Sequence, residues 1–247
     1  MKQKNNSKPY LSKKEKVIIS LVFSLHLLGI IVAFFRTDIP FHYHLLRFFC
    51  WWSVHTSILT VLAAVMMFRE SRYNSLPLGE RKKNSSYFTQ FITLLATMYN
   101  LITFLFWVYC LFFLKGSIEW EKSLLFNFQL VSWHIIAPLL TILYFYFYAR
   151  VDKLREKLLK TLLFAPISPV FYFFFTWTLA KLNYGVTSSL FPHLEKYPCR
   201  IFELITEVRW NWFIINFLTA AFVFILLCSL IIWTKIICDK KIKNYSE

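Results

Sequence analysis

Charged residues are scarce in this sequence: they make up only 17% of its 247 residues, whereas hydrophobic residues make up 57%. A soluble domain typically has about 25% charged and about 45–50% apolar residues. Disordered chains contain still fewer apolar residues. The composition therefore excludes an ordinary water-soluble enzyme and a disordered chain, and it predicts an integral membrane protein.

Cysteine and glycine are also rare, with five and four residues respectively. The cysteines are scattered and form no CxxC pair, so the sequence gives neither a disulfide framework nor a cysteine metal site. The glycines form no GxxxG spacing, through which many membrane helices pack closely. We therefore expect the helices to pack through other side chains.

Acidic residues are outnumbered by Lys and Arg, 13 to 28. In a soluble protein such an excess would suggest nucleic acid, but no nucleic-acid-binding motif accompanies it. The basic residues instead lie in short connections between apolar runs, where they set the orientation of a membrane protein. We therefore predict no nucleic-acid partner.

Long apolar runs dominate the sequence. A transmembrane helix needs about 20 largely apolar residues. Six runs meet this requirement: 17–35, 45–68, 87–114, 123–148, 161–180 and 210–237. The sequence therefore predicts an all-α, multi-pass membrane protein, with residues 1–247 forming a single domain of six transmembrane helices.

The distribution of basic residues predicts how these spans are oriented. If the N-terminus is cytoplasmic, 20 of the 28 Lys and Arg residues fall on the cytoplasmic side. Because loops rich in Lys and Arg stay in the cytoplasm, we predict a cell-membrane protein with both termini inside. A cytoplasmic interfacial helix is also predicted after residue 150, with an apolar face of Val151, Leu154, Leu158 and Leu159.

None of the six spans contains an acidic residue, which disfavours proton-coupled transport and excludes a Ser-His-Asp triad within the membrane. Polar residues instead form two stripes at helical spacing: Ser53, Thr56, Ser57 and Thr60 in the second span, and Thr89, Thr93, Thr97 and Asn100 in the third. Residues three or four apart share one face of a helix. The stripes predict a polar interior, although such stripes also serve only to pack helices.

His134 is the polar residue within a span that best fits a functional group, since such residues are rare in membranes. It shares a face of the fourth span with Pro138. With a rise of about 1.5 Å per residue, His134 lies roughly 16 Å deep, and Ser53 and Thr56 lie roughly 12 to 17 Å deep. The shared depth predicts a hydroxyl nucleophile paired with an imidazole base.

The other histidines are assigned to less specific roles. His26 and His55 are predicted to be packed, hydrogen-bonded side chains that are not partners of the second-span stripe. His42, His44 and His193 fall in the outer connections, where three imidazoles are one way to hold a metal, but interfacial anchoring is the better interpretation. We predict no metal and no cofactor.

Two segments, WSVHTSIL at 52–59 and WHIIAPLL at 133–140, carry the most distinctive motifs. They resemble the second-helix motif and the H-x-x-x-P motif of the androgen-induced-protein-like family of small membrane proteins. The segment PVFY at 169–172 and the pair Tyr197-Pro198 are similar to later motifs of that family. The matching order and spacing cover most of the chain after residue 45.

The resemblance implies an activity: hydrolysis of fatty acid esters of hydroxy fatty acids by an intramembrane Thr and a His. The family's His corresponds to His134. Its hydroxyl residues correspond to Ser53 and Thr56. The Gln and Asn of the family motif are replaced here by His55 and Ser57.

We therefore predict a polar cavity reached from the outer leaflet, in which Ser53 or Thr56 attacks a lipid-like ester and His134 acts as general base. The expected partners are membrane lipids and an amphipathic, lipid-like ligand, and the sequence does not define an oligomeric state. Two alternatives remain. One is a carrier or lipid-binding protein that only holds such a ligand, and the other is a structural or assembly protein whose stripes only pack helices.

Overall fold

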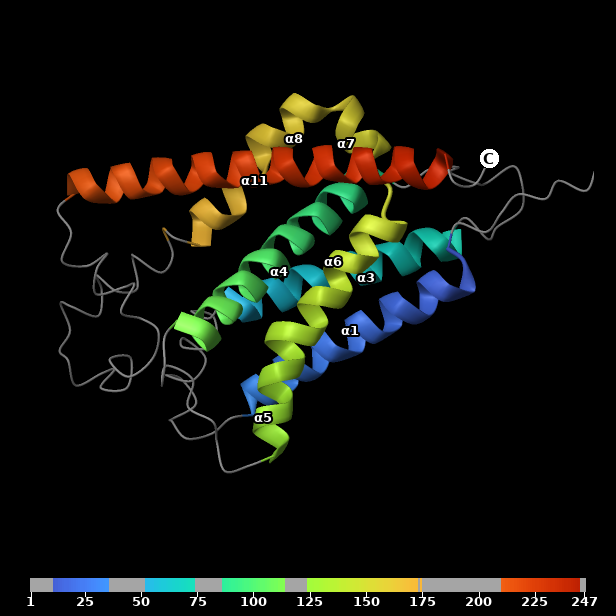
Figure 1. The fold of residues 1–247 in the computed structure, drawn as a ribbon, viewed down its shortest axis with the longest axis horizontal. Helices are drawn as coiled ribbons and strands as arrows, with labels where there is room; N and C mark the ends of the chain where they lie inside the picture. The colour runs from blue at the N-terminus through green and yellow to red at the C-terminus, as the bar shows by residue number, and fades with distance from the viewer. Residues whose placement is uncertain are drawn as a thin grey trace, which may run out of the picture. The chain divides into compact units, whose positions relative to one another are not determined.

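The computed structural model describes residues 11–35, 52–73, 86–113, 124–172, 174 and 210–244, and every regular element within them is a helix (Figure 1). These elements are α1 (Lys13–Phe34), α3 (Trp52–Tyr73), α4 (Tyr87–Phe113), α5 (Leu124–Val131), the π-helix η1 (Ser132–Ile136), α6 (Ala137–Tyr148), α7 (Asp152–Glu156), α8 (Leu158–Phe164) and α11 (Trp210–Asn244). The predicted all-α class is confirmed for this part of the chain.

Four helical segments are long and apolar enough to cross a membrane: Lys13–Phe34, Trp52–Ser71, Tyr87–Tyr109 and Ala221–Lys240. They coincide with the first, second, third and sixth predicted spans, as expected of a multi-pass membrane protein. Two further apolar helices, Ser132–Tyr148 and Leu158–Tyr172, overlap the fourth and fifth predicted spans but are shorter.

The chain divides into two compact units: Met1–Glu156 with Thr234–Glu247, and Lys157–Trp233. Within the first unit, α1, α3, α4 and α6 form a closed four-helix bundle (Figure 1). Helix α3 packs against α1 and α4, and α6 packs against the same two helices. The predicted polar residues of four different spans are therefore carried on helices that share one interior.

Helix α1 begins earlier than its apolar run. Ser12 and Glu15 form a capping box, in which the Ser12 hydroxyl accepts from the Glu15 N–H at 3.2 Å and the Glu15 carboxylate accepts from the Ser12 N–H at 2.6 Å. This reciprocal pair satisfies two backbone donors that a helix start leaves free. The side chains that α1 buries recur every three or four residues: Ile19, Val22, His26, Gly29 and Ala33.

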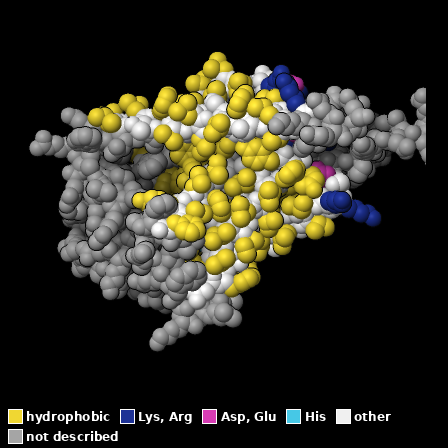
Figure 2. Space-filling view, viewed as in Figure 1, with side chains coloured by type: hydrophobic (Ala, Val, Ile, Leu, Met, Phe, Trp, Pro, Cys, Tyr) yellow, Lys and Arg dark blue, Asp and Glu magenta, His cyan; other side chains and the backbone are white. Residues whose placement is uncertain are grey.

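Large apolar side chains remain exposed on the other face of α1, among them Val17, Leu21, Leu28 and Ile31. Hydrophobic side chains also cover most of the described surface seen in Figure 2, and the few visible Lys and Arg side chains lie at its edge. A water-soluble protein seldom exposes so continuous an apolar surface. The surface is the one that a lipid-facing protein requires.

Helix α4 buries the whole polar stripe predicted for the third span. Thr89, Thr93, Thr97 and Asn100 are all 5% exposed or less. The hydroxyls of Thr93 and Thr97 donate to the carbonyl four residues earlier at 2.7 and 2.8 Å. Back-bonding of this kind lets a helix bury hydroxyls without partners on a neighbouring helix. The prediction that this stripe faces the interior is confirmed.

The single interfacial helix predicted after residue 150 is instead two short helices. Lys157 breaks the helical path between α7 and α8, with φ −118° and ψ 40°. Val151 and Leu154 are buried, whereas Leu158 and Leu159 are exposed. Their spacing predicted a single apolar face. The helix is interrupted at Lys157, however, and the side chains before and after the interruption differ in exposure.

Helix α7 is held by Gln90 of α4. The Gln90 amide donates to the Asp152 carboxylate at 2.7 Å and accepts from the Lys153 backbone N–H at 2.9 Å. The first N–H groups of a helix lack internal partners. A buried glutamine on a neighbouring helix thus caps the start of α7 and completes this end of the bundle.

Helix α11 carries a buried cation, Lys235, near its end. Lys235 is 2% exposed, and its ammonium donates to the Tyr146 carbonyl at 3.0 Å and pairs with Asp239. The Tyr146 carbonyl belongs to the last turn of α6, where carbonyl groups attract positive charge. The cation is buried because both a carboxylate and a helix terminus neutralise it.

Candidate functional site in the helix bundle

The fourth predicted span contains a π-helical turn that includes Trp133 and His134, the first two residues of the motif at 133–140. Within η1, the Ala137 N–H donates to the Ser132 carbonyl, five residues earlier. Pro138 follows at the start of α6 and supplies no N–H, and its ring would crowd the carbonyl of His134 in a regular helix. A widened turn relieves this conflict. Such π-turns occur often at functional sites.

His134 lies within η1 and is half-buried. Its Nδ1 bonds the Leu130 carbonyl at 2.9 Å, so Nδ1 carries the proton and the neutral ring has its free lone pair on Nε2. The ring stacks on Trp107 with a centroid distance of 4.5 Å. Among the residues that the structure describes, no hydrogen bond joins His134 to Ser53 or Thr56.

Thr56 is instead tied to α4. It is 1% exposed, and its Oγ1 lies 3.0 Å from the Trp52 carbonyl and 3.1 Å from Oγ1 of Thr103. Thr103 bonds the Tyr99 carbonyl in turn, at 2.9 Å. Ser53, one turn earlier, is half-buried. The pairing of either hydroxyl with His134 stays a prediction.

A different hydroxyl meets a different imidazole. Ser57 of α3 and His26 of α1 are both fully buried, and Ser57 Oγ lies 2.9 Å from His26 Nδ1. Trp133 of η1 donates its indole N–H to the same Ser57 oxygen. On the other side of the imidazole, His26 Nε2 lies 3.4 Å from Thr141 Oγ1 of α6. We call these four residues, Trp133, Ser57, His26 and Thr141, the central chain.

The direction of every hydrogen bond in the central chain follows from its two ends. An indole N–H can only donate, so Ser57 accepts from Trp133 and has its own proton left for His26. At the other end, the Thr141 hydroxyl donates to the Ala137 carbonyl at 2.8 Å, so it accepts from His26. Because burial disfavours the charged form of an imidazole, we assign His26 as the neutral ring protonated on Nε2, which presents the Nδ1 lone pair to the Ser57 hydroxyl.

Gly29 makes room for the first member of the central chain. A Cβ placed on Gly29 would lie 2.7 Å from the Trp133 ring, closer than side chains approach. Trp133 is buried in a cluster with Ala33 and Val54, so its ring has little room to retreat. Glycine at position 29 is thus required for the indole to reach Ser57.

The assignment of His26 from sequence was right in one respect and wrong in another. It is a buried, hydrogen-bonded histidine, as predicted, but its partner Ser57 belongs to the second-span stripe from which His26 had been separated. Counted from residue 17, His26 lies roughly 14 Å deep, close to the depth of the second-span hydroxyls. Which faces of α1 and α3 meet was not available from the spacing.

The rest of the predicted site residues divide into two groups. Pro138, which was predicted to share a face with His134, is buried at the start of α6. His42, His44, His193 and the Tyr197-Pro198 pair lie outside the described residues. Within the described residues, no three His, Cys, Asp or Glu side chains come together as a metal site would require.

Comparison with models of known protein families, with curated proteins and with solved structures finds no match for this chain. The resemblance of the motifs at 52–59 and 133–140 to the androgen-induced-protein-like family therefore stays a prediction.

Proposed function

We propose that the protein crosses the cell membrane six times with both termini in the cytoplasm. Four helices long enough to span support this topology, and α5, η1 and α6 continue one another from Leu124 to Tyr148, over most of the fourth predicted span. The excess of basic residues in the N-terminal segment, after the second and fourth predicted spans and at the C-terminal tail supports the orientation.

Thiol labelling tests this orientation. Cys199 should react with a membrane-impermeant reagent in intact cells, and Cys238 should react only after permeabilisation. The reverse pattern would overturn the orientation without affecting the arrangement of the bundle.

We further propose that the protein is a membrane-embedded hydrolase of lipid-like esters in which Ser57 is the nucleophile and His26 the general base. The observation that carries this proposal is the 2.9 Å contact between Ser57 Oγ and His26 Nδ1 in the buried central chain, where the assigned tautomer directs the Ser57 proton at the imidazole nitrogen. A serine hydroxyl is a weak nucleophile until an adjacent base takes its proton, and this geometry supplies the base.

The reaction would run in two steps. Ser57 Oγ bonds the ester carbonyl carbon while its proton moves to His26 Nδ1, and the alcohol leaves with that proton, giving an acyl-serine. Water then attacks the acyl-serine while His26 takes a proton from the water and returns it to Ser57, releasing the fatty acid. Thr141, which accepts from His26 Nε2, is a positioning residue because it fixes the tautomer that both steps need.

The proposal keeps the class of reaction that the motif resemblance implies and changes the pair of residues. In the resemblance, Thr56 or Ser53 acts with His134. In the bundle, the Thr56 hydroxyl is bonded to Thr103 and a backbone carbonyl, whereas Ser57 has an imidazole partner. Ser57 stands directly beside Thr56 in the sequence, so the two assignments share one helix turn but differ in face.

A fluorophosphonate probe distinguishes these assignments, because it forms a stable adduct only with an activated hydroxyl. We expect the purified protein to be labelled on Ser57, and Ser57→Ala to abolish labelling. His26→Gln, which keeps a hydrogen-bonding group but is no base near neutral pH, should slow labelling by about 10²- to 10⁴-fold. Thr97→Ala is the matched control, since Thr97 is equally buried and bonds only a backbone carbonyl.

Each other result has a definite meaning. An adduct on Thr56 or Ser53, abolished by His134→Gln, would overturn the Ser57 assignment in favour of the one implied by resemblance. No adduct on any of the three hydroxyls would overturn the hydrolase proposal, and a lipid that copurifies with such a protein would favour the carrier. Thermal unfolding of every variant separates loss of reactivity from loss of fold.

A further inference from the structure

Trp133 contacts the atom that reacts in the proposed function. Its indole N–H donates to Ser57 Oγ, and the same oxygen lies 2.9 Å from His26 Nδ1. An indole N–H has no lone pair to offer, so it cannot take the Ser57 proton. Trp133 therefore acts on Ser57 Oγ only as a hydrogen-bond donor, and His26 is the neighbour that can act as a base.

The proposed reaction places negative charge on this oxygen. When the Ser57 proton moves to His26 Nδ1, electron density builds up on Oγ before its bond to the ester carbon is complete. A hydrogen bond to a charged acceptor is roughly twice as strong as one to a neutral acceptor. The Trp133 N–H therefore binds Ser57 Oγ more strongly in the transition state than in the resting protein, and only such a difference accelerates the chemical step.

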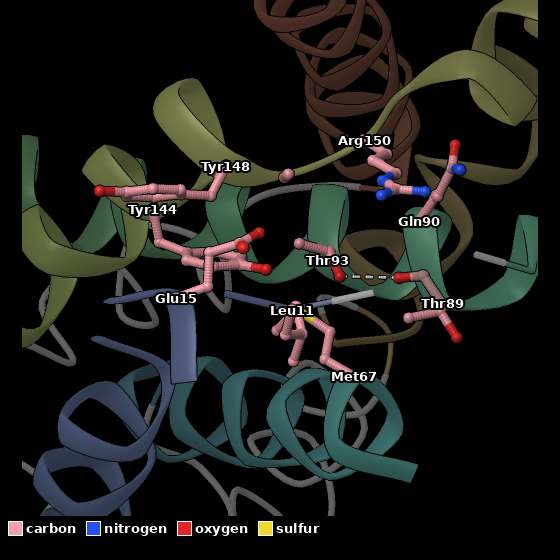
Figure 3. Close-up of a pocket in the computed structure, with 10 residues that line it drawn as sticks. Leu11, Glu15, Met67, Thr89, Gln90, Thr93, Tyr144, Tyr148 and Arg150 are labelled. Carbon is pink, nitrogen blue, oxygen red and sulfur yellow. Dashed lines mark hydrogen bonds between the residues drawn. The ribbon is translucent and has the colours of Figure 1, made fainter. Parts of the chain in front are cut away.

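Solvent does not reach this oxygen. Ser57 and His26 are fully buried, and Trp133 is 3% exposed. A small cavity of about 20 Å³ lies at the end of the bundle where α1 begins, and Glu15 and Tyr148 are among its lining residues (Figure 3). A second cavity has a volume of about 10 Å³. Neither is lined by Trp133, Ser57 or His26. Stabilising a charge on Ser57 Oγ therefore falls to a protein donor, and the indole N–H already contacts that oxygen.

The π-helical turn brings the indole to this position. Trp133 and Thr141 are eight residues apart, so on a regular α-helix they would lie about 80° apart around the axis. The wide turn of η1 takes up one extra residue and brings them to within roughly 20° of each other. Both side chains can then meet the same pair from one helix face, Trp133 at Ser57 and Thr141 at His26.

The indole is held in place before any substrate binds. The Trp133 ring packs in a buried cluster with Ala33 and Val54, and glycine at position 29 leaves the space that the ring needs. A donor fixed in advance requires no reorganisation at the moment of reaction, and in a dry interior it interacts with a charge more strongly than it would in water.

We propose that Trp133 is a catalytic residue whose indole N–H stabilises the negative charge that develops on Ser57 Oγ while His26 takes the proton. This inference rests on the proposed function, since no charge develops there unless Ser57 attacks. The alternative is that Trp133 only packs against α1 and α3, and that its N–H bonds Ser57 because a buried donor needs an acceptor. The two roles differ in how the reactivity of Ser57 responds when the N–H is removed and the ring is kept.

Benzothienylalanine, the sulfur analogue of tryptophan, separates these roles because it keeps the shape of the ring and has no N–H. When it replaces Trp133, we expect fluorophosphonate labelling of Ser57 to slow by about 10- to 100-fold, the loss expected for one hydrogen bond to a charged group. Thermal unfolding would show that the variant is still folded. The same replacement at Trp107, which stacks on His134, is the matched control and should leave the labelling rate unchanged.

A second replacement tests the proposal in the opposite direction. A ring-fluorinated tryptophan at position 133 keeps the N–H and makes it more acidic, hence a stronger donor, so it should speed the labelling of Ser57. Labelling at the native rate or faster in the folded benzothienylalanine variant would overturn the catalytic role, and a faster rate would mean that the indole shields Ser57.

This inference and the proposed function fail in different ways. If the native protein gives no adduct on Ser57, the hydrolase is rejected together with the role of Trp133 that rests on it. If the native protein is labelled on Ser57 and the folded benzothienylalanine variant is labelled equally fast, the hydrolase stands and only the role of Trp133 is rejected.

Discussion

Two polar regions of the same bundle differ in the groups that satisfy their hydrogen bonds and in their exposure to solvent. The central chain of Trp133, Ser57, His26 and Thr141 contains no charge, and each member both satisfies and orients the next. The second region, which we call the helix-end cluster, consists of Gln90, Asp152 and Lys153, and its bonds involve a carboxylate and the free N–H groups of α7. Asp152 is exposed, whereas all of the central chain is buried.

The difference follows from solvation. A charge loses several kcal/mol of hydration when it is buried, so charged groups are retained where water or lipid headgroups still reach one side. Neutral groups carry no such cost, and an ordered chain of neutral donors and acceptors deep in the bundle leaves none of its members unpaired. The central chain can therefore orient the Ser57 proton toward His26, whereas the helix-end cluster fixes the start of α7 against α4.

Removing the imidazole should have the largest effect. His26→Ala leaves the Ser57 proton and the Thr141 acceptor without their partner and opens a void between α1 and α6. We expect a loss of about 2 to 4 kcal/mol in the free energy of unfolding, measured by SDS titration of the purified protein in mixed micelles. Thr97→Ala, which removes only a back-bonded hydroxyl, should change it far less. Equal losses of unfolding free energy in the two variants would show that the central chain stabilises the protein no more than a single back-bonded hydroxyl does.

Gly29→Ala perturbs the central chain without replacing any of its polar groups. The new methyl group would meet the Trp133 ring, so the indole must move away from Ser57. We expect a loss of about 1 to 3 kcal/mol in the same titration, together with slower fluorophosphonate labelling. The double variant Gly29→Ala/Trp133→Phe provides the control, because the smaller ring removes the clash and should recover part of the stability but not the rate. Full stability in Gly29→Ala would contradict the close contact.

Gln90→Leu tests the helix-end cluster. The substitution leaves the Asp152 carboxylate and the first N–H groups of α7 without their buried partner. Because water can reach this end of the bundle, we expect a smaller loss, about 1 to 2 kcal/mol, and no change in fluorophosphonate labelling. Asp152→Ala should be milder still, since it removes one of these bonds. A loss as large as that of His26→Ala would erase the distinction between the two regions.

The smallest effect is expected at the exposed pair of Lys153 and Glu156. The Lys153 ammonium donates to the Glu156 carboxylate, and this hydrogen bond raises the pKa of the lysine above its ordinary value. A raised pKa means that any stabilisation is complete at neutral pH and is lost as the pH rises through it. Because water screens this pair, Glu156→Gln should unfold at the same temperature as the native protein from pH 7 to pH 9. A measurable shift in the unfolding temperature would show that this ion pair contributes to the stability of the protein.

Much of the fold was predictable because a membrane imposes simple rules on sequence. The first, second, third and sixth spans appeared as apolar runs since a helix must match the thickness of the bilayer. The Thr89 to Asn100 stripe was found inside because polar groups avoid lipid. The break at Lys157 was not predicted, since spacing alone carries no information about where a helical path is interrupted.

The sequence predicted a hydroxyl–imidazole pair within the bundle, and the structure contains one between Ser57 and His26, while the predicted pairing of Ser53 or Thr56 with His134 stays a prediction. The sequence indicated that hydroxyls and an imidazole would meet near mid-membrane, and it supplied Ser57 within a polar stripe. The partner depends on how α1, α3 and η1 are rotated against each other, and Thr56 and Ser57, although adjacent, face different neighbours. Successive residues of a helix are rotated by about 100°, so Thr56 contacts α4 while Ser57 contacts α1.

By itself, the sequence determined that this protein is helical, apolar on its surface and free of buried carboxylates in its spans, because those properties depend on composition and periodicity. The tertiary structure alone decided that His26 of the first span bonds Ser57 of the second, that Gly29 leaves room for Trp133, and that Gln90 caps the start of α7. Each of these depends on the distance between residues far apart in the chain, and such distances are set by the packing of whole helix faces rather than by any local pattern.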